Sequence, residues 1–140
     1  MKRNVIGALM TLIVAFTIAV PVVNAQSTIL TANVPFAFTI GDKQLPAGPY
    51  AVREVGRATL VQSKDAVYSV VGIYNYAGPL KGDETKLVFD KVGDHYFLAQ
   101  IWTSARGQGL QVPESKLEKE MRASNTGPQG GVETVIVALR

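Results

Sequence analysis

Histidine is the side chain that most often serves as a catalytic base near neutral pH, and this chain has one, His95. It follows Asp94 at the start of a β-rich run, no serine stands in a G-x-S-x-G turn, and cysteine is absent. The residues needed for nucleophilic catalysis by a Ser–His–acid or Cys–His arrangement are therefore not found in a recognisable pattern. We interpret His95 as a structural or solvent-facing turn residue and predict that the protein is not an enzyme.

Metal binding and glycoside hydrolysis would both depend on carboxylates here. With one histidine and no cysteine, a zinc site is poorly supported. Asp83 with Glu84, and Asp90 with Asp94, lack the loop pattern of a calcium site, so we interpret them as solvated turn charges and expect no metal or cofactor. A hydrolytic pair stays open by residue count and would need two carboxylates about 5 to 10 Å apart in a cleft. Its candidates are Asp42, Glu54, Asp65, Asp83 and Asp90.

The strongest candidate for a ligand-binding surface is aromatic. Tyr68, Tyr74 and Tyr76 fall on one face of a predicted strand, and Tyr96 and Trp102 are expected near them. Such rings stack on sugars, peptides or flat ligands. Because aromatic residues are enriched in strands as core and cross-strand pairs, we favour that structural interpretation over a binding site.

The segment Val34–Ile40 is the most regular predicted strand, because large apolar residues alternate along it and define an inward face. Those residues are Val34, Phe36, Phe38 and Ile40. The following stretch, residues 41–49, is rich in Gly, Pro and Asp and predicts a chain reversal before a return strand from Tyr50.

Further strands are predicted at residues 50–55, 58–63, 66–76, 85–92, 95–103 and 132–140. Gly93 and Asp94 form the turn of the clearest hairpin, while residues 77–84 and 104–113 are predicted loops. In the last strand Val135, Val137 and Leu139 share one face.

One helix is predicted at residues 114–124. Ser115 and Glu118 have the spacing of a capping box, and Leu117 with Met121 would form a narrow apolar stripe against the sheet. Together these elements predict an all-β fold, an antiparallel β-sandwich or small β-barrel of about seven strands, with one short helix before the last strand.

The N-terminus predicts export. Lys2 and Arg3 precede an uncharged apolar run, residues 5–20, and then small residues, which is the layout of a secretory signal peptide cleaved after Ala25. The run is short for a membrane anchor, which needs about 20 residues, so we expect no stable membrane insertion after cleavage. We predict a signal peptide at 1–25 and a single β-rich domain at 26–140, located in the periplasm or outside the cell.

Net charge argues against nucleic acid as a partner. The whole chain carries 14 basic and 11 acidic residues, but without Lys2 and Arg3 the balance falls to 12 against 11. Such a near-neutral domain has no general attraction to nucleic acid or anionic lipid.

Three blocks of this sequence are similar to a known family. "VPFAFTIGDKQLPAGPYAV", "YFLAQIW" and the "VPESKLEKE" segment occur in this order, and together they resemble short exported bacterial proteins of unknown function that are numerous in soil bacteria. Val112 stands where that family pattern has Leu. The resemblance implies export and a β-rich domain, and it implies no chemistry.

These observations favour an exported, non-enzymatic structural or interaction module of the bacterial envelope, bound to an unidentified protein or small-ligand partner. The alternative is a small-ligand carrier that uses the aromatic sheet face or a barrel interior. Strand-mediated self-association is a further possibility, because the segment from Gln26 to Phe38 can pair within the chain or with a neighbour. We favour pairing within the chain.

Overall fold

The computed structural model describes residues 29–56, 58–65, 67–70, 75–79, 84–104, 107–125 and 131–140. The predicted signal peptide lies outside these residues. Within them the chain forms eleven β-strands and one α-helix, which stands just before the last strand. The predicted all-β class and the position of the helix are therefore confirmed.

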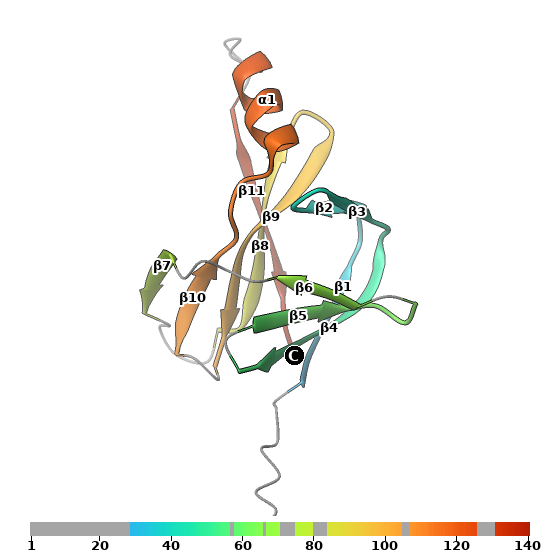
Figure 1. The fold of residues 1–140 in the computed structure, drawn as a ribbon, viewed down its shortest axis with the longest axis vertical. Helices are drawn as coiled ribbons and strands as arrows, with labels where there is room; N and C mark the ends of the chain where they lie inside the picture. The colour runs from blue at the N-terminus through green and yellow to red at the C-terminus, as the bar shows by residue number, and fades with distance from the viewer. Residues whose placement is uncertain are drawn as a thin grey trace, which may run out of the picture.

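Four strands form the first sheet, and all its neighbours are antiparallel (Figure 1). Their order is β1 (Ile29–Val34), β4 (Gly48–Val55), β5 (Ala58–Gln62) and β6 (Val67–Val70). The N-terminal strand β1 thus pairs within the chain, as we favoured from the sequence.

The second sheet has seven strands. Five follow the order β11 (Glu133–Ala138), β8 (Lys86–Val92), β9 (His95–Thr103), β10 (Gln108–Gln111) and β7 (Asn75–Pro79). The hairpin of β2 (Phe38–Ile40) and β3 (Lys43–Leu45) joins this sheet through one parallel contact, Thr39 to Phe97 on β9.

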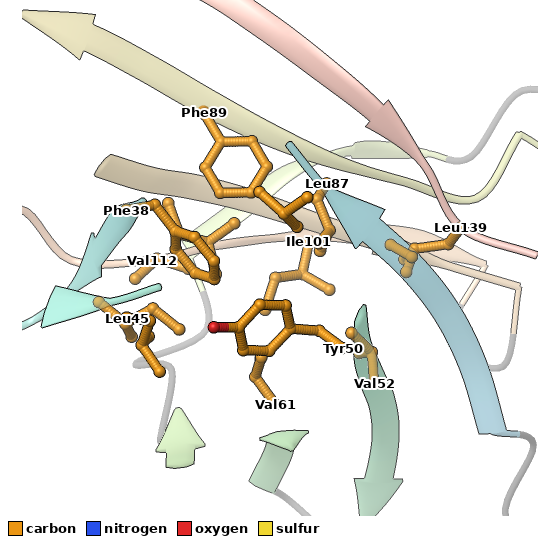
Figure 2. Packing of buried hydrophobic residues seen from close by; sticks show 14 of the residues in the cluster. Phe38, Leu45, Tyr50, Val52, Val61, Leu87, Phe89, Ile101, Val112 and Leu139 are labelled. Atoms are coloured by element: carbon orange, nitrogen blue, oxygen red, sulfur yellow. The ribbon is translucent and has the colours of Figure 1, made fainter. Parts of the chain in front are cut away.

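The two sheets enclose one apolar core, which Figure 2 shows in close view. The sheets meet at one corner, where the backbones of Thr31 and Arg140 exchange two hydrogen bonds of 2.7 and 2.9 Å. The described strands do not close into a barrel, so the architecture is that of a β-sandwich. The core residues below 2 % exposure include Val34, Phe38, Leu45, Val52, Val61, Leu87, Phe89 and Ile101.

The predicted strand Val34–Ile40 is wrong as a single element, although its inward face is right. β1 ends at Val34, residues 35–37 are not in a strand, and β2 begins at Phe38. Val34, Phe38 and Ile40 are buried and Phe36 packs against the core. Pro35 has no backbone N–H to donate to a neighbouring strand, which accounts for the end of the strand at this point.

Three other boundaries differ from the prediction. The segment 66–76 is not one strand, because β6 belongs to the first sheet and β7 to the second, with residues 71–74 outside the described part. Two predicted loops contribute strands, since residues 77–79 lie in β7 and residues 108–111 form β10. The glycines in both segments led to the prediction of loops. They form strands because pairing with neighbouring strands outweighs the weak local preference of glycine against a strand.

The β8–β9 hairpin carries a bulge. Val88 pairs with Gln100 and Phe89 pairs with Leu98, which leaves Ala99 as an extra residue on β9. Because one inserted residue reverses the alternation of side chains, Leu98 and Ile101 both reach the core.

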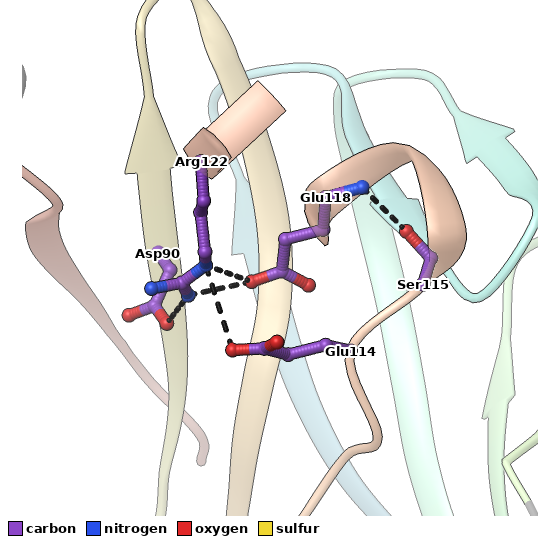
Figure 3. Close-up of polar contacts among 5 residues, drawn as sticks. All are labelled: Asp90, Glu114, Ser115, Glu118 and Arg122. Atoms are coloured by element: carbon purple, nitrogen blue, oxygen red, sulfur yellow. Dashed lines mark hydrogen bonds and ion pairs between the residues drawn. The ribbon is translucent and has the colours of Figure 1, made fainter. Parts of the chain in front are cut away.

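The helix α1 (Lys116–Ser124) begins after the N-cap Ser115, as predicted, but the Glu118 carboxylate bonds to Arg122 instead of completing a capping box. The Ser115 hydroxyl oxygen accepts a hydrogen bond of 3.1 Å from the backbone N–H of Glu118 (Figure 3). The expected apolar stripe is wrong in one respect, because Leu117 is 45 % exposed and the buried helix residue is Glu118. No helix within the described residues has the length and apolar character needed to span a bilayer.

Candidate interaction site: the free edge of β11

The aromatic residues singled out from the sequence do not gather on one strand. Tyr68 is in β6 and Tyr76 in β7, which belong to different sheets, and Tyr74 lies outside the described residues. Tyr96 faces the core, where its ring stacks on Phe36 with centroids 3.9 Å apart. The Ala99 bulge turns Trp102 to the opposite face of the sheet. The expected surface from Tyr96 to Trp102 is therefore not formed.

Trp102 is held by its own neighbours. Its indole N–H donates to the Gln100 amide oxygen at 2.9 Å, and the Lys86 Nζ lies 5.5 Å from the ring centroid. The ring also covers the backbone of Gly109 on β10. These contacts describe a ring packed on the sheet.

His95 is exposed and begins β9 at the hairpin turn, as expected. Two of the candidate carboxylates, Glu54 and Asp90, are engaged in separate contacts. Glu54 accepts a 2.5 Å hydrogen bond from the Thr103 hydroxyl, which links the two sheets. Asp90 is not a solvated turn charge, because it lies within β8 and accepts a 2.6 Å hydrogen bond from Arg122. Asp83 lies outside the described residues.

Arg122 gathers three carboxylates and fastens α1 to β8 (Figure 3). Its guanidinium lies 2.6 Å from both Asp90 and Glu118 and 3.5 Å from Glu114. Burial raises the pKa of the Glu118 carboxyl above its ordinary value, although the hydrogen bonds from Arg122 act in the opposite direction. Those hydrogen bonds in turn raise the pKa of Arg122. In the described part of the chain, no group of three His, Cys, Asp or Glu is placed to hold a metal ion.

The open feature of the molecule is the outer edge of β11. Leu139 donates its backbone N–H to Thr85, so the odd-numbered residues of this segment bond toward β8. The alternating pattern of an antiparallel strand directs the backbone groups of Thr134, Ile136 and Ala138 to the other side. Among the described residues no strand pairs with that side of β11, although β1 lies beside its C-terminal end, where Arg140 meets Thr31.

The side chains along this edge are unlike those of a protected edge. Ile136 is 60 % exposed and the preceding Val132 is 42 % exposed. Natural sheets usually blunt an edge with proline, lysine, a bulge or an inward-pointing charge. β11 contains none of the first three, and its single charge, Glu133, is bonded to Lys91 at 3.3 Å.

Space for an added strand exists beside this edge. Beyond the contact of Thr31 with Arg140, β1 of the first sheet diverges from β11, and a pocket of about 420 Å³ opens between β1 and the end of β11. Asn33 and Pro49 line it on one side, and Ala138 and Arg140 line it on the other. An incoming strand can therefore pair with β11 up to Ala138, where the Thr31–Arg140 contact closes the edge.

From the sequence, the N-terminal strand was the candidate for pairing with a neighbouring molecule. In the structure the strand with an unpaired edge is the last one, β11. The alternation of Val135 and Val137 with Ile136 predicted a strand with one inward face. It could not indicate that this strand would lack a neighbouring strand on one side. Comparison with protein-family models, curated proteins and solved structures finds no match to this chain.

Proposed function

We propose that this protein is an exported, non-enzymatic structural module of the bacterial envelope that associates with a second copy of itself through the β11 edge. The observation that carries the proposal is the unpaired edge with exposed Ile136. The signal-like N-terminus and the absence of cysteine are consistent with an exported protein that does not rely on disulfides.

A second copy fits this edge because the strand is self-complementary. In an antiparallel pair centred on Ile136, that residue faces its own copy, and Thr134 faces Ala138. The same register places Val135 opposite Val137 and leaves Glu133 beyond the paired stretch, so no like charges oppose each other. Such a ladder adds about six backbone hydrogen bonds and buries the two exposed Ile136 side chains against each other.

The association is expected to be weak and reversible. Each net hydrogen bond contributes about 0.5–1.5 kcal/mol, and the edge alone is smaller than a standard protein interface. Sedimentation velocity from about 10 μM to 1 mM should show a concentration-dependent shift from monomer to dimer. A species that stays monomeric over this whole range would contradict the proposal.

Two variants localise the contact. Ile136→Lys should abolish the dimer, because the pairing register places two ammonium groups opposite each other. Leu117→Lys is the matched control, since Leu117 is an exposed apolar residue on α1, and it should leave the dimer unchanged. Equal loss in both variants would show that general surface hydrophobicity, rather than the β11 edge, drives association.

The register can be tested by cross-linking, because the chain contains no cysteine of its own. Ile136→Cys treated with a short bismaleimide should give a covalent dimer, and Leu117→Cys should give little. A dimer that persists in sedimentation but fails to cross-link at position 136 would assign the association to another surface.

A further inference from the structure

Arg53 is a cation that has no countercharge among the described residues. It lies on the outer face of the first sheet, between Ile29 of β1 and Leu60 of β5 in the strand register. Its Nε is buried and has no hydrogen-bond partner, and in the described part of the chain the guanidinium makes no ion pair. Because the Nε is buried, the donors that a ligand can reach are those of the two terminal nitrogens of the guanidinium.

A groove surrounds this side chain. It measures about 500 Å³ and runs over β1, β4 and the end of β5. Its polar and charged side chains include Thr31, Arg53, Gln62 and Lys64. The described residues that line it include two cations, Arg53 and Lys64, and no carboxylate.

The walls also offer apolar surface. Ile29 is 57 % exposed at one end of the groove, and Pro49 with Ala51 forms part of the floor. A groove of this volume falls within the range of small-ligand sites, which combine mostly apolar walls with a few polar groups that fix orientation.

We propose that this groove, defined by Arg53, Lys64, Ile29 and Ala51, binds a small organic acid by its carboxylate. A guanidinium offers parallel N–H donors that match the two oxygens of a carboxylate, and Lys64 supplies a second positive charge. Ile29 and Ala51 contact the carbon chain of the ligand. The groove shares Thr31 and Pro49 with the pocket beside β11, but its two cations lie on β4 and after β5, and binding there does not require the dimer.

Hexanoate is a suitable probe, because it joins a carboxylate to a short apolar chain. In two-dimensional amide NMR of the purified protein, titration with hexanoate should give saturable shifts in residues 29–33, 49–53 and 60–64. Hexylamine has the same chain with the opposite charge and should give none. The absence of saturable shifts with hexanoate would overturn the proposal.

Arg53→Gln should weaken hexanoate binding by about tenfold or more, since the main donor is lost. Lys64→Gln should weaken it less, and Lys116→Gln, an exposed lysine on α1, should not change it. Because the Arg53 side chain makes no hydrogen bond or ion pair in the described part of the chain, Arg53→Gln should also keep the wild-type melting temperature. Equal affinity in wild type and Arg53→Gln would overturn the assignment.

Inorganic phosphate distinguishes two sources of an oxyanion. If phosphate produces the same shifts at lower concentration than hexanoate, the groove selects phosphate and the carboxylate assignment is wrong. If hexanoate binds more tightly than both phosphate and acetate, the apolar walls contribute as proposed.

Discussion

The indole ring of Trp102 lies directly over Gly109, its partner on the neighbouring strand β10. A Cβ placed on Gly109 would lie 2.6 Å from a ring carbon, which is far inside van der Waals contact. Gly109 therefore leaves space for the indole ring. The ring in turn shields the Gly109 backbone, which has no side chain of its own to shield it.

Gly109→Ala is consequently expected to lower the free energy of unfolding by about 1–3 kcal/mol, the usual cost of overpacking. Urea denaturation followed by tryptophan fluorescence measures it, because Trp102 is the single tryptophan. Gly131→Ala is the control, since a Cβ there meets nothing within 4 Å. Equal midpoints for the two variants would show that the ring moves aside at no cost.

Arg122→Met should detach α1 from the sheet. It leaves Glu118, whose side chain is 5 % exposed, without its cation and removes the link to Asp90. Breaking a buried pair costs about 3–5 kcal/mol, and because Arg122 and Asp90 are partly exposed we expect about 2–3 kcal/mol. Hydrogen exchange should then show early loss of protection in α1.

Lys116→Met provides the comparison for that experiment. Lys116 pairs with Glu120 at 3.8 Å, but both side chains are largely exposed, so the loss should be small. If Lys116→Met destabilised α1 as much as Arg122→Met, the network around Arg122 would not be what holds the helix.

Local pattern predicted the features that depend on neighbours in sequence. The N-cap at Ser115 and the inward face of the last strand follow from spacing alone, because each depends on a single helix turn or strand. That face carries Val135, Val137 and Leu139. The inward set from Val34 to Ile40 was also right, even across a break in the strand.

Features set by partners distant in sequence were missed. The bulge at Ala99 depends on how β9 meets β8, and it decides that Tyr96 and Trp102 face opposite sides. The strand β10 forms because β9 and β7 pair with it, despite its glycines. The open edge of β11 depends on the order of all strands in the sheet, which no local pattern contains.

The stability of the protein should carry a pH dependence from Glu118. Its pKa in the folded state lies above the ordinary value of 4.5, so the folded protein binds more protons than the unfolded chain between these two values. The contribution of Glu118 to the free energy of unfolding is therefore full below pH 4.5 and falls as pH rises through the folded pKa.

Denaturation of the wild type and Glu118→Gln at several pH values measures this contribution. The stability of the wild type relative to Glu118→Gln should decrease as pH rises from about 4 to 7. Glu120→Gln, on the exposed side of the same helix, should follow the wild-type profile. A wild-type advantage over Glu118→Gln that grows with pH would show that the hydrogen bonds from Arg122 outweigh burial.

Proline substitutions separate the two edges of β11. Thr134 directs its backbone N–H to the free side, so Thr134→Pro removes no bond to β8 and should change the free energy of unfolding little. Val135 directs its N–H to β8, opposite Phe89, so Val135→Pro breaks the ladder and should cost about 3 kcal/mol or more.

Thr134→Pro also tests the proposed association. Thr134→Pro should remain folded yet fail to dimerise in sedimentation velocity, because it lacks a donor that the partner strand needs. Thr134→Val is the control, because it changes the side chain but keeps the backbone N–H, and it should dimerise as the wild type does. Loss of the dimer in Thr134→Pro alone would therefore be an effect of the backbone. Dimerisation of Thr134→Pro at wild-type strength would mean that the two copies meet elsewhere, and the free edge of β11 would then need another partner.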